Sequence, residues 1–271
     1  MTLSPDRTRK YLNILVEPIR VCAAYRPKFG QGVGAGLTVT EFQTLYGGDP
    51  FYSWFGLDNA MMYAAHKTAG GITSIYRQIG IAGERLFRAV LVDELGLSDD
   101  QVTWSYTVQT AGGRTRRLSL DGRIPLDFVA DTRVRERVAD WIRRAAADLD
   151  VAPAVIETLK GVVFEIRQGY KSKDSKRQNA DIANATNSYA HAYLPCLLIL
   201  STQIDTDIQV RYRNTKWAVL TGLPDEESDL RSTYEFMRQV VGFDLAGFFA
   251  EHSPMLKQEV HRVLKNLLSP K

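Results

Sequence analysis

The spacing of apolar residues predicts helices in the first hundred residues. Apolar side chains recur at the 3.6-residue period of a helix over residues 9–25, and again over residues 81–95. Thr38 and Glu41 stand three positions apart, which is the spacing of a capping box and predicts the start of a short helix. We therefore expect residues 1–100 to form a helical N-terminal region.

Near residue 102 the pattern changes to strands that alternate with helices. Residues 102–109 and 115–120 alternate between apolar and polar side chains, and Gly112 and Gly113 between them predict a hairpin turn. Further strands are predicted at residues 124–129, 162–169, 196–201 and 217–221, and helices at residues 133–149, 178–193, 226–241 and 255–268. This order predicts an α/β fold in which helices flank a mixed central sheet. We expect this core, with its C-terminal helices, over residues 101–271, and one structural unit with residues 1–100 because no linker is evident.

Composition and charge narrow the class of protein. Apolar residues make up 45% and charged residues 24%, as in globular proteins. There is no run of about twenty apolar residues and no export signal, so we expect a soluble cytoplasmic protein without a membrane partner. Cys22 and Cys196 are far apart in sequence, which argues against a disulfide scaffold or a zinc site. The net charge is only +3, but basic residues cluster at 114–117, 133–144 and 171–177, where they can contact phosphates.

Two carboxylates are candidates for metal-dependent hydrolysis of a phosphodiester. That chemistry requires a divalent cation held by oxygen ligands beside the scissile phosphate, and a group that assists the attacking water. Asp121 ends the second strand of the hairpin, and Glu165 lies within the apolar strand 162–169, where an unpaired charge would be costly. Because side chains alternate along a strand, we expect Glu165, Arg167 and Lys171 on one face.

This arrangement resembles the PD-(D/E)XK nuclease superfamily, and type II restriction endonucleases in particular. The core of those enzymes runs from a hairpin to an acidic residue, a strand with an acid-x-lysine triplet, a helix and a further strand. The same order runs here through Leu120-Asp121-Gly122, Phe164-Glu165-Ile166-Arg167, the helix from Gln178 and the apolar strand from Tyr193. The resemblance covers residues 100–221 and implies a PD-(D/E)XK restriction-endonuclease-like core.

The resemblance also implies an activity. It implies Mg²⁺, with Mn²⁺ as a substitute, bound by Asp121 and Glu165, and sequence-specific cleavage of double-stranded DNA that leaves 5′-phosphates. Such enzymes act as homodimers on palindromic sites, within a restriction-modification system. They often place a further glutamate near the metal, and Glu84 is the candidate; the alternative is an exposed helix residue paired with Arg88.

Two features depart from the family pattern. Arg167 stands in place of the usual lysine, and an arginine stays protonated, so it can stabilise charge on the phosphate but cannot act as a base. We therefore expect Lys171, with Lys173 as the alternative, to supply the catalytic lysine. The interval between the two acids is also long, with a helix inserted in it, and Asp127 is an alternative to Asp121 as the first metal ligand.

The residues that follow the catalytic strand are the candidates for DNA recognition. Segment 171–181 is rich in hydrogen-bond donors; lysines and helix N-termini bind phosphates, while Arg, Gln and Asn read base edges. The candidate DNA-binding residues are Lys173, Lys176, Arg177, Gln178, Asn179 and Asp181. Asp181 also begins a polar stripe through Asn184, Ser188 and His191, which either lines the DNA cleft or is a solvated helix face.

Two other segments could suggest nucleotide binding. The glycine-rich segment 30–36 has no strand before it and no Gly-Lys-Ser/Thr after it, so we interpret it as a loop. The aromatic stretch 51–63 could stack on bases, but we interpret it as part of the hydrophobic core.

Two rival hypotheses have other consequences. The same core could belong to a repair nuclease or another nuclease without sequence preference, which would reduce a plasmid to a smear instead of discrete bands. Since Arg167 replaces the lysine, the chain could also be a catalytically inactive DNA-binding protein, which would bind duplex DNA in a salt-sensitive manner and never cut it.

Overall fold

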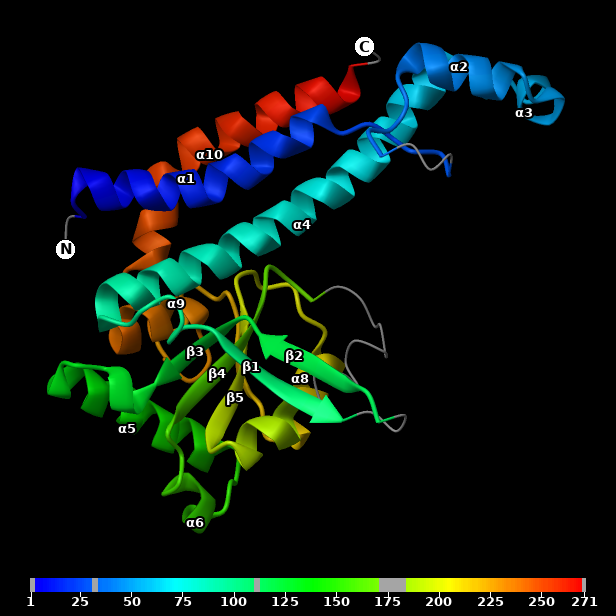
Figure 1. Cartoon of the computed structure of the whole chain (residues 1–271). Helices are drawn as coiled ribbons and strands as arrows, with labels where there is room; N and C mark the ends of the chain where they lie inside the picture. Colours follow the sequence, from blue (N-terminus) through cyan, green and yellow to red (C-terminus); the bar gives the residue numbers. More distant parts are fainter. Residues whose placement is uncertain (1–2, 31–33, 110–112, 171–183, 270–271) are drawn as a thin grey trace. The chain divides into compact units, whose positions relative to one another are not determined.

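The computed structural model describes residues 3–30, 34–109, 113–170 and 184–269 (Figure 1). The chain forms two compact units: unit 1 comprises residues 1–82 and 251–271, and unit 2 comprises residues 83–250. Both divisions fall inside helices, α4 (Ala60–Leu95) and α10 (Leu245–Leu268), which continue from one unit into the other.

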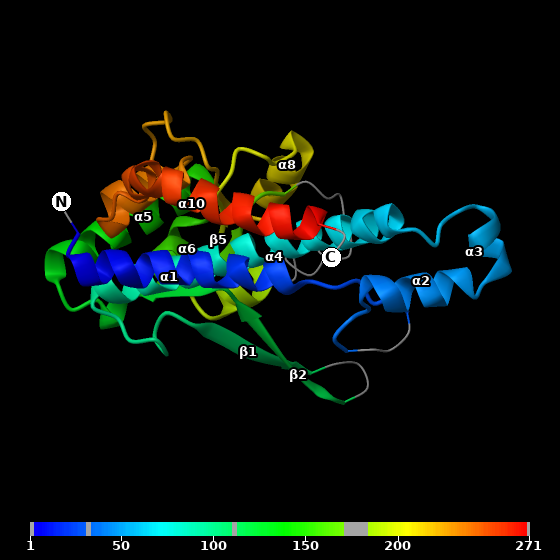
Figure 2. The ribbon, with the colours of Figure 1, turned by 90° about the horizontal axis from the view of Figure 1, so that it is seen from above.

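Unit 1 is built of helices, as the apolar spacing predicts. Helices α1 (Pro5–Val21), α2 (Val39–Gly47) and α3 (Pro50–Trp54) precede α4, and the later part of α10 completes the unit (Figure 2). The capping box is confirmed, since the Thr38 hydroxyl accepts from the Glu41 amide and the Glu41 carboxylate accepts from the Thr38 amide. A buried cluster joins α1 and the 3₁₀ turn after it (Cys22–Ala24) to α4 and α10; its members are Ile19, Cys22, Ile75, Val263 and Leu267.

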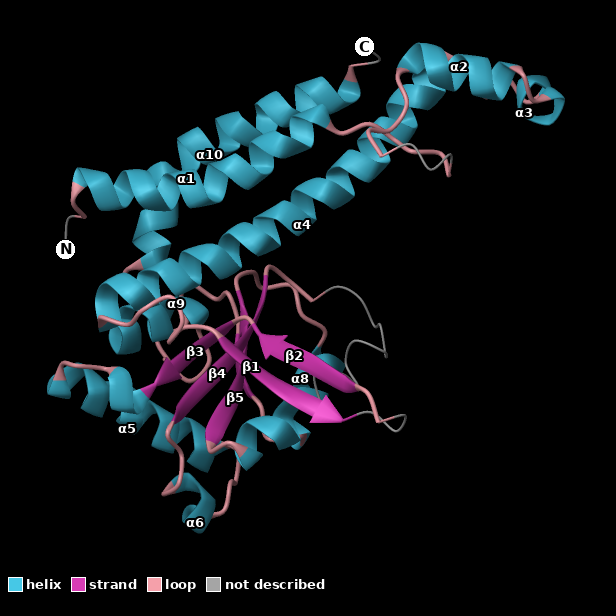
Figure 3. Ribbon diagram, viewed as in Figure 1, coloured by secondary structure: helices cyan, strands magenta, loops and turns pink. Residues whose placement is uncertain are grey.

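In unit 2, the described residues form two sheets (Figure 3). Strands β1 (Trp104–Gln109) and β2 (Thr115–Leu120) make the predicted antiparallel hairpin. A second sheet has the order β3-β4-β5-β6, and its strands are β3 (Gly122–Pro125), β4 (Gly161–Arg167), β5 (Tyr193–Ile199) and β6 (Ala218–Leu220). Because β3 is antiparallel to β4 while β4, β5 and β6 are parallel, the sheet is mixed, as expected.

Helices flank this sheet on both faces. They are α5 (Thr132–Asp148), α6 (Pro153–Ile156), the helical residues 184–190, α8 (Thr206–Asn214), α9 (Thr233–Glu235) and a π-helical turn, Phe236–Val241. On one face, Val163, Leu197 and Val219 belong to a buried cluster that includes Trp104 of the hairpin and Tyr212 of α8. The sequence prediction of an α/β fold with a mixed, helix-flanked sheet is therefore confirmed.

The other face of the sheet carries aromatic packing. The Phe164 ring on β4 lies 4.9 Å from the ring of Phe87 on α4 and 5.7 Å from the ring of Phe236, measured between centroids. Trp141 of α5 packs against the same Phe236 at 4.6 Å. Side chains alternate along β4. Those of its even-numbered residues thus point toward α4 and α5, and those of its odd-numbered residues point toward the hairpin and α8.

Several expected elements differ in extent; the helix expected at 81–95, for example, begins at Ala60. The strand expected at 124–129 stops at Pro125, which has no amide hydrogen for the ladder, and a 3₁₀ turn, Leu126–Phe128, follows. The helix expected at 226–241 begins only at Thr233, because the residues before it form a loop bound to α5. The last helix begins at Leu245 instead of residue 255.

Candidate active site

Asp121 lies at the junction of β2 and β3, where hydrogen bonds hold both its backbone and its carboxylate. Its amide donates to the carbonyl of Phe164 at 2.8 Å, and its carboxylate Oδ2 accepts from the amide of Ile166 at 2.8 Å. The Arg88 guanidinium of α4 donates to the Asp121 carbonyl at 2.6 Å. The carboxylate therefore continues the β3–β4 ladder past Gly122 and lies beside the peptide that joins Glu165 to Ile166.

Glu165 is a nearly buried charge on β4 and forms an ion pair with Arg167. The residue is 7% exposed, and it stands two positions from Val163 on the face that the hairpin and α8 cover. Its carboxylate contacts the guanidinium of Arg167, whose side chain is 14% exposed. A carboxylate at such depth requires a partner, because an uncompensated buried charge is strongly destabilising.

Lys171 was expected on the same face as Glu165 because side chains alternate along a strand. Strand β4, however, ends at Arg167, four residues before Lys171. Tyr170, an even-numbered residue, is buried in the cluster that also holds Val163, so the side-chain direction shifts by one residue after Arg167. The Tyr170 amide donates to the carbonyl of Gln203 at 2.6 Å, which joins this segment to the chain beyond β5. Lys171, Lys173, Lys176, Arg177, Gln178, Asn179 and Asp181 lie outside the described residues.

The structure brings Asp121, and not Asp127, next to Glu165. Asp127 is exposed in the 3₁₀ turn after β3. The register pairs Gly122 with Phe164 but Pro125 with Gly161, so Asp127 lies beyond the amino end of β4. The two candidate acids are therefore separated by the full length of β3.

Glu84 lies on the part of α4 that packs on the sheet of unit 2. One turn later on the same helix, the Phe87 ring makes an edge contact with Phe164, and Arg88 binds the Asp121 carbonyl. A side chain on the preceding residue, Gly83, would meet Leu200 at 2.5 Å, just after β5. Glu84 is thus half-buried on a helix face whose neighbours contact β3, β4 and the end of β5.

Asp121 and Glu165 carry carboxylate oxygens, the ligand type that a divalent cation takes in proteins. Mg²⁺ is commonly held by one or two carboxylates, with water and phosphate oxygens completing its shell. A cation would have to share the Asp121 carboxylate with the Ile166 amide and the Glu165 carboxylate with Arg167. Within the ranges that the structure describes, no group of three or more His, Cys, Asp or Glu side chains is gathered as a metal site.

Two of the three described residues of the polar stripe after β4, Asn184 and Ser188, are buried, so the interpretation as a solvated helix face is wrong for these two. Ser188 is fully buried and its hydroxyl donates to the Asn184 carbonyl at 2.8 Å. The Tyr106 hydroxyl of the hairpin donates to the Asn184 side chain, and burial raises the pKa of Tyr106. These residues hold the hairpin on the helix at 184–190, while His191 at its end is exposed.

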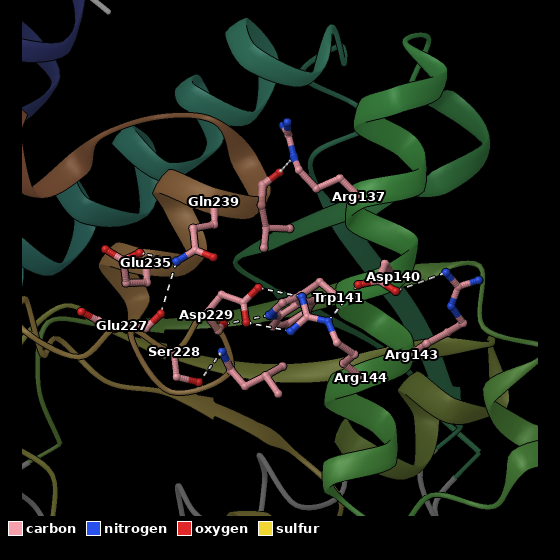
Figure 4. A network of polar contacts seen from close by, with 12 residues as sticks. Arg137, Asp140, Trp141, Arg143, Arg144, Glu227, Ser228, Asp229, Glu235 and Gln239 are labelled. Atoms are coloured by element: carbon pink, nitrogen blue, oxygen red, sulfur yellow. Dashed lines mark hydrogen bonds and ion pairs between the residues drawn. The ribbon is translucent and has the colours of Figure 1, made fainter.

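A second polar network joins α5 to the loop before α9 (Figure 4). The Arg144 guanidinium binds both carboxylate oxygens of Asp229, at 2.9 and 2.7 Å, and also binds Asp140 at 2.8 Å. The Trp141 indole donates to the carbonyl of Asp229 at 2.8 Å. These pairings raise the pKa of Arg144, mainly through Asp229. The network fixes the loop against α5.

Sequence reasoning missed Arg88 as a residue of the candidate site. From sequence, Arg88 is only a possible ion-pair partner of Glu84, four positions before it. In the structure, Arg88 also contacts the carbonyl of Asp121, which lies 33 residues later. No local pattern encodes such a contact.

Neither a scan of protein-family models nor searches of curated proteins and of solved structures found a match to this chain. Among the described residues, none of the helices combines the length and apolar character that crossing a bilayer requires.

Proposed function

We propose that this protein is a Mg²⁺-dependent endonuclease of the PD-(D/E)XK type that cuts double-stranded DNA at a defined sequence, as type II restriction enzymes do. The observation that carries the proposal is the hydrogen bond from the Ile166 amide to the Asp121 carboxylate, which brings the first acid beside Glu165. The order of elements supports it, because hairpin, acid, acid-bearing strand, helical segment and parallel strand follow one another as in that superfamily.

The residues have separate roles in this proposal. Asp121 and Glu165 hold the cation, with Glu84 as a further ligand. The cation supplies positive charge beside the scissile phosphate and makes water easier to deprotonate. Arg167 stabilises negative charge on the phosphate, and its contact with Glu165 orients that carboxylate. Lys171, or Lys173 in its place, assists the attacking water.

DNA recognition in this proposal rests on the segment beyond β4. Lysines 173 and 176 contact phosphates, and the candidates for base contacts are Arg177, Gln178, Asn179 and Asp181. A two-fold homodimer would read a palindromic site, and each protomer would cut one strand to leave a 5′-phosphate.

The test is digestion of unmethylated phage DNA by the purified chain in Mg²⁺ and in Mn²⁺, beside Asp121→Asn and Glu165→Gln. We expect discrete fragments from the parent and at least about a 100-fold loss of rate in both variants, since groups that merely orient a metal ligand already change activity by about 10- to 100-fold. Asp127→Asn is the matched control, because Asp127 is a nearby exposed acid beyond the other end of β3. Equal losses in Asp127→Asn and Asp121→Asn would contradict the assignment of Asp121.

One observation favours a rival, the catalytically inactive DNA-binding protein. The Glu165 carboxylate is already engaged by Arg167, and a permanent arginine cation there opposes a metal ion. A chain that shifts duplex DNA on a gel, with a steep salt dependence, and cuts none with either cation would establish this rival. A smear in place of bands would indicate a nuclease without sequence preference.

A further inference from the structure

The tip of unit 1 presents large apolar side chains to solvent. Helix α3 lies at the end of the arm formed by α2 and the start of α4 (Figure 2). Phe51, Trp54, Phe55 and Met61, here named the aromatic cap, are 59%, 80%, 68% and 81% exposed. The interpretation of the aromatic stretch as core is therefore wrong for these residues, although it is confirmed for Tyr63, which is 2% exposed.

The aromatic cap is held by an ordered scaffold. The Asp49 carboxylate caps α3 by accepting from the amides of Phe51 and Tyr52. The Tyr52 ring stacks on Tyr46 of α2 at 4.6 Å, and the Phe51 ring lies 5.2 Å from Phe55. The cap therefore keeps a defined shape in the unbound chain, which lowers the entropy that binding must overcome.

The area of the cap matches what a symmetric dimer requires. Aromatic side chains bury about 150–250 Å² each, so at the exposed fractions given above the three aromatic residues offer on the order of 400 Å², and Met61 brings the total to roughly 600 Å² if its area is similar. This exposed apolar area is as large as the largest apolar patch on a typical monomer, which is about 300–600 Å². Two caps together would bury about 1,200 Å², which reaches the range of specific interfaces.

The charge around the cap excludes nucleic acid and anionic lipid as its partner. No lysine or arginine occurs between Lys28 and Lys67, and the acids in that interval are Glu41, Asp49 and Asp58. A surface that binds phosphates needs cations. Asp58 accepts from the Ser53 hydroxyl at 3.3 Å, and Asp49 caps α3, so both acids have local contacts within the arm.

We infer that the aromatic cap is the surface through which two copies of this chain associate. An uncharged apolar patch is complementary to itself, which is what a two-fold interface demands. Trp54 and Phe55 are its anchors, because large exposed aromatics carry most of the binding energy in interfaces. The inference does not depend on nuclease activity, since association is measured without DNA or metal.

The experiment is sedimentation equilibrium of the full chain over a wide concentration range. We expect a monomer–dimer equilibrium in the parent and at least a 100-fold higher dissociation constant in the Trp54→Ser/Phe55→Ser variant. Phe128→Ser is the matched control, because Phe128 is a 54% exposed aromatic in unit 2, and its dissociation constant should match the parent. Circular dichroism should be unchanged in both variants, because the replaced side chains are exposed.

A second measurement identifies the partner surface. Phe55→Cys should form an intermolecular disulfide in oxidant, while the native Cys22 and Cys196 are buried. A parent that stays monomeric at all concentrations would overturn the inference. So would a dimer of the parent that survives the double substitution, or a Phe55→Cys dimer that fails to cross-link.

Discussion

Replacing Arg88 by methionine tests whether α4 positions Asp121, the first metal ligand of the proposed nuclease. The Arg88 guanidinium donates to the Asp121 carbonyl at 2.6 Å from a partly buried position. Methionine keeps the apolar length of the side chain and removes the donor. A hydrogen bond from a charged group contributes about 1.5–3 kcal/mol net, which corresponds to about 10- to 150-fold in an equilibrium constant.

The expected effect is on the Mg²⁺ dependence of DNA cleavage. Groups that orient metal ligands typically change metal affinity or activity by about 10- to 100-fold, so the Mg²⁺ concentration for half-maximal cleavage should rise by about that factor. Cleavage at saturating Mg²⁺ should fall less, because Asp121 keeps its hydrogen bonds to Phe164 and Ile166. Arg88→Lys retains a cationic donor and should recover part of the loss.

The assay is single-turnover cleavage of a supercoiled plasmid across a Mg²⁺ titration, with thermal unfolding measured in parallel. Arg85→Met is the control, since Arg85 is exposed on the same helix. If Arg88→Met had the Mg²⁺ midpoint of the parent while remaining folded, the argument that Arg88 positions Asp121 would be refuted.

Three further predictions concern stability. The hydrogen bond from Arg20 lowers the pKa of Glu259 from its ordinary 4.5, so this stabilisation is present above that pH and lost as the pH falls through the lowered value. Glu259→Gln should therefore reduce the melting temperature near neutral pH, with a difference from the parent that shrinks below pH 4.5; a constant difference would contradict this pairing. Asp229→Asn should lose about 1–3 kcal/mol in urea unfolding, because it weakens the bidentate contact with Arg144 at 2.7 and 2.9 Å; an unchanged midpoint would count against it. Gly161→Ala should cost about 1–3 kcal/mol in the same assay, because its new carbon would lie 2.2 Å from a carbonyl of β3, and a neutral result would mean that the strands separate freely.

Much of the secondary structure could be predicted from local sequence. The period of two over residues 102–120 predicts the hairpin, and the apolar runs predict β4 and β5, because both patterns reflect which faces the chain must bury. The spacing of Thr38 and Glu41 predicts the start of α2, because a cap satisfies amides only three residues away.

The extent of some elements depends on partners distant in sequence. The sequence predicts a helix for the residues before α9, but the structure shows a loop there. Asp229 in this loop binds Arg144, which lies 85 residues earlier. The side-chain direction at Tyr170 likewise follows its contact with Gln203, beyond β5, and not the alternation of β4.

The sequence by itself determined which acids were candidates, since a charge in an apolar strand and an acid after a hairpin are local features. It could not choose between Asp121 and Asp127, because both follow strand-like segments. Only the tertiary structure decided which of them lies beside Glu165, through the register of β3 on β4 and the amide of Ile166. It also decided that Trp54 is exposed, because burial depends on what packs against a residue in space, and sequence spacing specifies only the neighbours along the chain.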